Sequence, residues 1–225
     1  MRKFTFLLSI MTSCFLYGQH VFVETGRNNS SFKFENNAGE EQENLQSKTF
    51  SYVTAGYKHQ ILTEGLNITT GLSYNTYGAL GSDTEFNTFF EWDIHYLGLN
   101  LGLDYTLFTA NKFSFYIQAG GSAEIMLDGV QTINNEVINV KDVEEFDDIA
   151  YFLRGGGGVR LAVSETTQIY AQYLYGTGLA LNDNNNSAIT ELRINVHSIG
   201  IGVLVDISPS VKEGTPELDT DESQN

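Results

Sequence analysis

Residues 112–127, KFSFYIQAGGSAEIML, alternate between an apolar and a mostly polar face. One face carries Phe113, Phe115, Ile117, Ala119, Ala123, Ile125 and Leu127. The other carries Ser114, Gln118, Gly120, Ser122 and Glu124. Alternation with a period of two predicts a β-strand. The stretch exceeds the roughly 9 to 11 residues that a tilted strand needs to cross a bilayer.

The same alternation recurs along the chain, and there is no proline between His20 and Ile207. We predict strands near residues 20–27, 48–59, 65–79, 89–105, 112–126, 148–163, 167–181 and 190–207. Short and longer connections alternate between them, which is typical of barrels in the outer membrane. The sequence therefore predicts an all-β fold: an eight-stranded antiparallel up-and-down transmembrane β-barrel over residues 19–207.

Composition narrows the possible partners. The 225 residues include 28 Asp and Glu against 12 Lys and Arg, so the formal charge is -16. Such a chain lacks the basic surface that binds a phosphate backbone, and we expect no nucleic acid partner. The single Cys excludes a disulfide within the chain. We expect a monomer.

The two ends of the chain differ from the predicted barrel. Residues 1–18 have the charged, apolar and small-residue order of a secretory signal peptide. An alternative stays open, because Met11-Thr12-Ser13-Cys14 approximates a lipobox in which Cys14 would be acylated. Residues 208–225 contain both prolines and several carboxylates, which predicts an acidic, disordered periplasmic tail. Short turns then lie in the periplasm, and so do both termini.

Two predicted strands change the parity of their apolar residues. In residues 89–105, Leu97 to Leu103 occupy one parity, whereas Phe90, Trp92 and Ile94 occupy the other. Residues 190–207 change between Val196 and Ile199. Two explanations stay open. One-residue bulges near His95-Tyr96 and His197-Ser198 would restore an apolar exterior, or both upper halves project beyond the bilayer.

Three segments carry a family resemblance: Tyr17-Gly18-Gln19, the opening strand HVFVETG at residues 20–26, and GLNLGLDY at residues 98–105. With these, the chain resembles small outer-membrane barrels of the OmpA/OmpX-like and PorT-like type from Bacteroidota. The resemblance implies an outer-membrane location and does not imply an open porin. One departure is the end of the last strand, Val205-Asp206-Ile207, which lacks a terminal aromatic residue.

Eight strands leave an interior just wide enough for side chains to fill, so we expect a packed lumen without cofactor, metal or catalytic residues. Charges of both signs on the predicted inner faces can pair in this low-dielectric interior. The predicted polar network of the lumen consists of Glu24, Lys58, Asp93, His95, Asp104, Glu124, Arg154, Arg160, Arg193 and Asp206.

Catalytic motifs are weak. Gly155 to Gly158 are not followed by the Lys-Ser/Thr of a phosphate loop. His197 and Ser198 are adjacent in a strand and point to opposite faces unless a bulge lies between them. Asp93 and His95 share a face and resemble the pair that activates water in outer-membrane proteases, but those are larger barrels. A lipid-modifying enzyme and a narrow gated channel stay open as alternatives.

We expect the protein to act structurally, or in adhesion or ligand binding, through acidic extracellular loops, with outer-membrane lipid as its surroundings. The loop acids would suit an extracellular ligand or a divalent cation. They are Glu40, Glu41, Glu43, Asp142, Glu144, Glu145, Asp147 and Asp148. Residues 137–140 are predicted to extend a hairpin above the membrane, where its edge would pair with a partner.

Overall fold

The computed structural model describes residues 19–35, 45–61, 63–83, 88–140, 149–179 and 191–207. The predicted signal peptide, the acidic tail and the acidic loop residues lie outside them. Within the described residues no helix has the length and apolarity to cross a membrane. The strands are β1 (Gln19–Glu35), β2 (Leu45–Gln60), β3 (Leu66–Asp83), β4 (Thr88–Ala110), β5 (Phe113–Ile133), β6 (Glu136–Asn139), β7 (Ala150–Ala162), β8 (Thr167–Gly178) and β9 (Glu191–Asp206).

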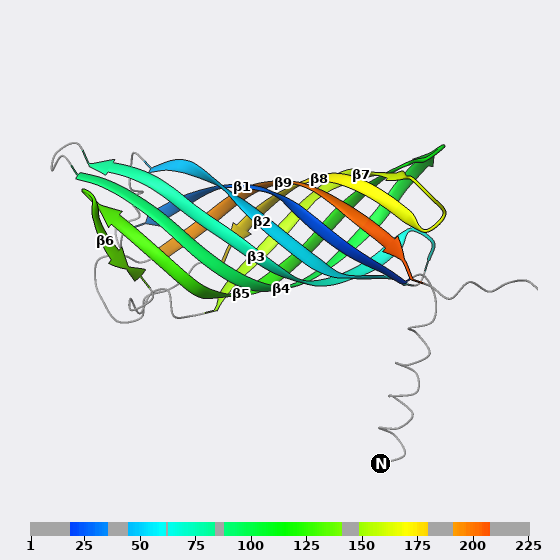
Figure 1. Cartoon of the computed structure of the whole chain (residues 1–225), viewed down its shortest axis with the longest axis horizontal. Coiled ribbons are helices and arrows are strands. Elements are labelled where there is room, and N and C mark those ends of the chain that lie inside the picture. The colour runs from blue at the N-terminus through cyan, green and yellow to red at the C-terminus, as the bar shows by residue number, and fades with distance from the viewer. Residues whose placement is uncertain are drawn as a thin grey trace, which may run out of the picture.

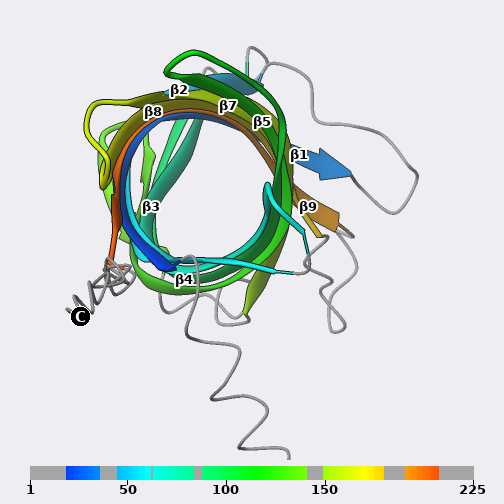
Figure 2. The same cartoon turned by 90° about the vertical axis from the view of Figure 1, so that its right-hand side faces the viewer.

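Eight of these strands close into a ring (Figure 2). The order around it is β4-β3-β2-β1-β9-β8-β7-β5, and pairing of β4 with β5 completes the circle. The pairs are antiparallel. The prediction of an eight-stranded antiparallel up-and-down β-barrel is therefore confirmed.

The ninth described strand, β6, lies outside the ring. It pairs with the end of β5, from Val130 to Ile133, at the end of the barrel opposite to the start of β1 (Figure 1). Asn134 and Asn135, with φ values of 48° and 70°, make the turn between the two strands. Positive φ at both positions is what a two-residue hairpin turn of type I′ requires, and Asn tolerates it. The predicted hairpin extension is present.

Several strands are longer than a bilayer crossing requires. β4 has 23 residues and β5 has 21, against the about 9 to 11 that suffice. β1 continues to Glu35, because Ser31 to Glu35 pair with Asn195 to Glu191 of β9. A part of the barrel therefore extends past any membrane that it crosses.

The proposed bulges are wrong as an explanation of the parity change. β9 pairs with β1 and with β8 in unbroken register through His197 and Ser198. At His95-Tyr96 the register between β4 and β5 does shift, but the extra residue is Leu127 of β5. The alternation of β4 itself is continuous, so its apolar residues truly change from one face to the other.

This change is an inversion of polarity along single strands. Near the start of β1, Leu99, Leu101 and Leu103 of β4 face outward, while Gly98, Asn100 and Asp104 face the lumen. Towards β6, the outward positions belong to Glu91, Asp93 and His95, and the inward positions to Trp92, Ile94 and Tyr96. We call the part towards β6 the inverted end.

β9 inverts in the same way. Ile199 and Ile201 are each 64% exposed on the outer surface, whereas Ile194 and Val196, closer to the inverted end, are buried inside. Near the start of β1 the outer surface forms an apolar belt. It includes Val21, Val23, Val53, Leu72, Leu99, Leu101, Leu103, Phe115, Ile117, Leu153, Ile169, Ile199, Ile201 and Val203. An apolar exterior with a polar interior suits lipid surroundings, and the reverse suits water.

Candidate functional site in the barrel lumen

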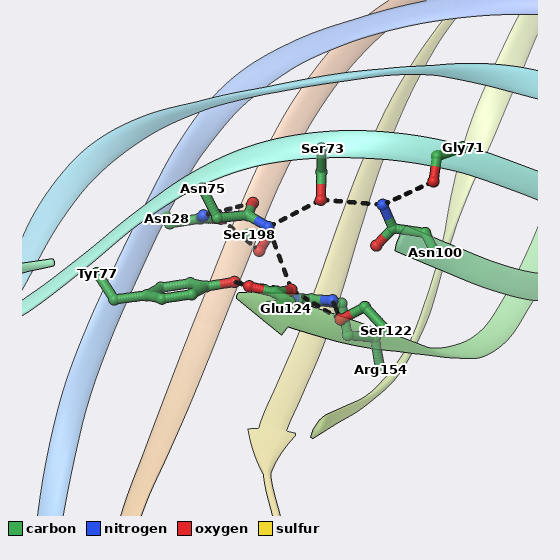
Figure 3. A network of polar contacts seen from close by, with 10 residues as sticks. All are labelled: Asn28, Gly71, Ser73, Asn75, Tyr77, Asn100, Ser122, Glu124, Arg154 and Ser198. Atoms are coloured by element: carbon green, nitrogen blue, oxygen red, sulfur yellow. Dashed lines mark hydrogen bonds and ion pairs between the residues drawn. The ribbon is translucent and has the colours of Figure 1, made fainter. Parts of the chain in front are cut away.

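The centre of the lumen holds an ion pair between Glu124 of β5 and Arg154 of β7 (Figure 3). Arg154 Nη2 lies 2.7 Å from Glu124 Oε1. The Tyr77 hydroxyl lies 3.0 Å from Glu124 Oε2, and Ser122 Oγ donates to Glu124 Oε1 at 2.7 Å. Glu124 has no exposed surface. Its charge is therefore neutralised by Arg154 and shared among hydroxyl donors, as burial of a carboxylate requires.

Neutral side chains extend this network across the lumen. Asn75 donates through Nδ2 to Glu124 Oε1 at 3.2 Å and to Ser73 Oγ at 3.0 Å. Asn28 Nδ2 donates to Asn75 Oδ1 at 3.4 Å, and Ser198 Oγ donates to Asn28 Oδ1 at 2.7 Å. The network links β5 through β3 to β1 and β9 (Figure 3). It therefore crosses the interior and does not only follow its wall.

A second cluster of charged side chains surrounds Asp104 of β4, near the end of the barrel where β1 starts. Its carboxylate contacts Lys58 Nζ at 2.5 Å and Arg160 Nη2 at 2.6 Å. Asn67 donates to the same carboxylate at 3.0 Å. The Arg160 guanidinium also lies 3.9 Å from the centroid of the Tyr116 ring, within the range of a cation–π interaction.

Glu24 of β1 is held by neutral donors. Tyr52 Oη donates to Glu24 Oε1 at 2.6 Å, and Gln172 Nε2 donates to Glu24 Oε2 at 2.8 Å. Tyr116 in turn donates to Gln172 Oε1 at 2.8 Å. Across the three groups, Glu24, Asp104 and Glu124 are matched in number by Lys58, Arg154 and Arg160. Among the described residues, the buried charges of these three groups therefore balance.

Glycines in the wall make room for the large side chains of the lumen. A Cβ at Gly200 would lie 2.2 Å from Tyr52 Oη and 2.8 Å from Glu24 Oε1. One at Gly202 would lie 2.4 Å from Cζ of Tyr170. Both tyrosines thus approach the wall closely where it has no side chain. This close approach explains glycine at these positions.

Apolar side chains fill the lumen of the inverted end. The rings of Phe32 and Trp92, from β1 and β4, have centroids 6.0 Å apart, and those of Tyr77 and Phe152, from β3 and β7, are 5.2 Å apart. Neither pair belongs to neighbouring strands, so these contacts cross the interior. The buried cluster consists of Phe32, Tyr77, Ala79, Trp92, Ile94, Tyr96, Val140, Ala150, Phe152, Ile194 and Val196.

A polar cavity of about 90 Å³ lies between this cluster and the end of the barrel where β1 starts. Its lining includes Glu24, Lys58, Asn75, Arg154 and Gln172. The space is sufficient for several water molecules, which need polar partners of this kind. The lumen therefore has room for water in this cavity, whereas apolar side chains fill it at the inverted end.

Six of the ten residues predicted for the lumen network lie together there: Glu24, Lys58, Asp104, Glu124, Arg154 and Arg160. Asp206 lies at the end of β9, half-buried, opposite His20 of β1. Asp93, His95 and Arg193 differ from the prediction, because they lie on the outer face. Their neighbours Trp92, Ile94 and Ile194 occupy the inward positions instead.

Asp93 is part of an ion pair on the outside of the inverted end. β2 leaves the register of β3 between Ser47 and Tyr52, and Lys48 of β2 reaches both Glu91 and Asp93 of β4. Burial opposes the positive charge of Lys48, but these two carboxylates outweigh it and raise the pKa of Lys48 above its ordinary value. The ion pair thus links two strands that are not neighbours.

Ser30 of β1 stabilises the same irregularity from inside. Its hydroxyl donates to the Gly78 carbonyl at 2.8 Å and accepts from the Gly78 amide at 2.8 Å. It thereby supplies the partner that β2 does not give to β3 at this point. The sequence contains no pattern that would have predicted this contact. Tyr52, Asn75 and Tyr77 were also missed, although their inward parity in the strands was a usable signal.

The residues considered for catalysis are separated. His197 faces outward, where its Nδ1 lies 2.7 Å from the Tyr173 hydroxyl, whereas Ser198 faces the lumen and bonds Asn28. His95 Nδ1 lies 3.0 Å from Thr76 Oγ1, while Asp93 contacts Lys48. Among the described residues, no three or more His, Cys, Asp or Glu gather as metal ligands.

The fold and its lumen define a closed β-barrel with a side-chain-filled interior. Solved structures with similar folds include Neisserial surface protein A, at 13% identity and a TM-score of 0.47, with 84% of this chain and 99% of that chain covered. Another is OprG, an outer membrane protein of Pseudomonas aeruginosa, at 15% identity and a TM-score of 0.46, covering 83% and 95%.

A third similar structure is Ail, the attachment invasion locus protein of Yersinia pestis, at 12% identity and a TM-score of 0.39, covering 84% and 99%. No family model matches the chain, and no curated protein matches it. The fold itself is established by the strand pairing, which closes the ring of eight strands.

Proposed function

We propose that the protein is a closed, non-catalytic β-barrel of the outer membrane, which anchors its inverted end at the cell surface for adhesion or ligand binding. The inversion of polarity in β4 and β9 carries this proposal. The apolar belt matches the membrane core, and the charged exterior around Glu91 and Asp93 matches water. The inverted end is then extracellular, and the start of β1 is periplasmic. Membership of the PorT-like type is part of the proposal.

A role in conduction is disfavoured by the contents of the lumen. An ion passing through would have to cross the apolar cluster around Trp92 and Tyr77 without water or compensating charge. Next to this cluster, Glu124 and Arg154 form an ion pair and neutralise each other's charge. We propose that the barrel serves as a rigid anchor for the surface that it exposes.

Heat-modifiable migration tests the membrane barrel. In an isolated outer-membrane fraction, the unboiled protein is expected to migrate differently from the boiled protein, because a closed barrel resists cold detergent. Recovery in the soluble fraction without a shift would overturn the proposal. Planar-bilayer recordings of the same folded protein test closure, and steady conductance through single barrels would contradict a filled lumen.

We expect the acidic loops to determine which external ligand the protein binds. A divalent cation is the simplest candidate, and calorimetric titration of the folded barrel with CaCl₂ tests it. Neutralising Asp142, Glu144 and Glu145 together is expected to weaken the heat of binding, while the heat-shift on gels is retained. An unchanged titration would direct the search to other ligands of this end, beginning with the exposed strand β6.

A further inference from the structure

We propose that Arg27 and an apolar groove below it form a binding site for a phosphate-bearing lipid of the outer leaflet. The proposal rests on the proposed function, since it needs the barrel to lie in the membrane with its inverted end outside. The groove would take an acyl chain and Arg27 would take the phosphate group.

The groove lies on the outer wall across β1, β9, β8, β7 and β5. Its volume is about 590 Å³. Small side chains, Thr25 and Ala171, lie in register on either side of Ile201. Larger ones surround them. The outward-facing lining comprises Val23, Thr25, Phe113, Val159, Leu161, Ile169, Ala171, Ile201 and Val203. Such a surface suits hydrocarbon.

Arg27 marks the upper limit of the groove. It follows Thr25 by two residues and therefore points to the same outer face of β1. It is exposed. Its Nη1 donates a hydrogen bond to Ser51 Oγ at 3.0 Å. A guanidinium has five N–H donors in a fork that fits two phosphate oxygens. Arg27 is therefore suited to hold a phosphate while keeping the contact with Ser51.

Polar and aromatic side chains lie on the outer face of the next two strands, β9 and β8. His197 of β9 is opposite Asn29, which makes it a diagonal neighbour of Arg27 on the outer face. His197 shares a hydrogen bond with Tyr173, and Tyr175 packs against it with ring centroids 5.1 Å apart. Aromatic residues gather where a barrel meets the headgroups of the lipid. Arg27 thus lies at headgroup height.

The charge of the outer face differs around the ring. β1 and β9 lie opposite β5 and β4 in the order of the eight strands. On the β4–β5 side the outward residues of the inverted end include Glu91, Asp93 and Asp128. A phosphate would be repelled there and attracted to Arg27. In a chain of net charge -16, the exposed guanidinium of Arg27 thus favours a phosphate on the β1–β9 side.

Native mass spectrometry of the folded barrel in detergent tests the site. The probes are phosphatidic acid and diacylglycerol with the same acyl chains, so that only the phosphate differs. Arg27→Gln is compared with Lys112→Gln, which removes the same charge in the β4–β5 turn at the other end. Ala171→Phe fills the groove and leaves Arg27 in place. The wild type and all variants are first checked for the heat-shift on gels. If the wild type shows no shift, the proposed function fails, and this result is separate from a failure of the lipid site.

The wild type is expected to retain phosphatidic acid over diacylglycerol. Arg27→Gln should lower this retention about tenfold, as loss of a charge-assisted hydrogen bond of roughly 1.4 kcal/mol implies. Lys112→Gln should match the wild type, and Ala171→Phe should also lower retention. Equal retention by Arg27→Gln, an equal loss in Lys112→Gln, or no effect of Ala171→Phe would overturn the proposal. Displacement by excess inorganic phosphate alone would also overturn it, because the site would then bind a free anion.

Discussion

The rings of Tyr77 and Tyr96 lie 5.7 Å apart at their centroids, and both side chains are buried, but their hydroxyl groups differ. Tyr77 Oη contacts Glu124 and accepts from Arg154. Tyr96 Oη has no hydrogen-bond partner among the described residues. The two tyrosines lie at the boundary between the polar lumen and the apolar cluster, and only one of them takes part in the network.

Removing the two hydroxyls should therefore have opposite effects. Tyr96→Phe is expected to raise the free energy of unfolding by about 1 kcal/mol, because it removes a buried polar group without a partner. Tyr77→Phe should lower it by about 1.5 to 3 kcal/mol, since it breaks bonds to charged groups. Urea titration of the two variants in lipid vesicles measures both. Destabilisation by Tyr96→Phe would show that its hydroxyl has a partner.

Gly202→Ala should destabilise the barrel by about 1 to 3 kcal/mol, because the new methyl group would overlap the Tyr170 ring. Gly155→Ala is the matched control, as the nearest atom of the described residues to its Cβ would be Gln118 O, at 3.8 Å. Alanine there should be neutral or stabilising by about 0.5 to 1 kcal/mol. Equal effects of the two substitutions on the temperature of the gel shift would contradict the packing of Tyr170 on the wall.

Arg154→Met should cost about 3 to 5 kcal/mol, because it leaves the buried Glu124 without its counter-charge. The double variant Glu124→Gln with Arg154→Met should recover much of this loss. Urea titration of both single variants and the double variant gives the coupling between the residues. Additive losses would mean that the two side chains do not interact in the folded protein.

The position of the membrane is tested by adding a charge to the outer surface. Leu99→Arg in the apolar belt should cost about 2 to 4 kcal/mol in vesicles, and Ser82→Arg at the inverted end only about 0 to 1 kcal/mol. Both positions are exposed on the outer face. Similar costs at the two positions would place the inverted end within the bilayer as well.

Lys48→Met should lower the free energy of unfolding by about 1 kcal/mol, the order expected for a partly exposed ion pair. The pKa of Lys48 is raised from 10.5 in the folded protein. The contribution of the charged Lys48 to the free energy of unfolding is therefore fully present below pH 10.5, and it is lost as the pH rises through the folded pKa. The difference in urea midpoint between wild type and variant should shrink at high pH. A constant difference would indicate instead the loss of packing on the Phe50 ring, whose centroid lies 4.7 Å from Lys48 Nζ.

The sequence was sufficient for the barrel but not for the inverted end. Residues 112–127 alternate so regularly that the outward face of β5 follows directly from them. The change of parity at Tyr96 was visible too, but a bulge and an inversion leave the same pattern in one strand. Only the register with the partner strands distinguishes them. Asp93, His95 and Arg193 were assigned to the lumen for this reason.

Contacts across the interior were harder to predict than faces. The inward positions of Arg154 and Glu124 followed from alternation, but alternation says nothing about which strands meet across the lumen. The link from Lys48 to Asp93 depends on β2 leaving β3, and Ser30 bonds a strand that is not its neighbour. Such contacts depend on the curvature of the ring and on local irregularities, which one sequence does not encode in a recognisable pattern.

The inversion in β4 also means that one strand follows two opposite rules of substitution. A leucine at an inward position should fit beside Ile94, where the interior is apolar, and should disturb the strand at Asn100, where the interior is polar. At outward positions the preference reverses between His95 and Leu97. The effect of a leucine substitution on stability thus changes sign where β4 crosses the membrane surface. A leucine scan along β4 would locate this surface to within one or two residues without any lipid being observed.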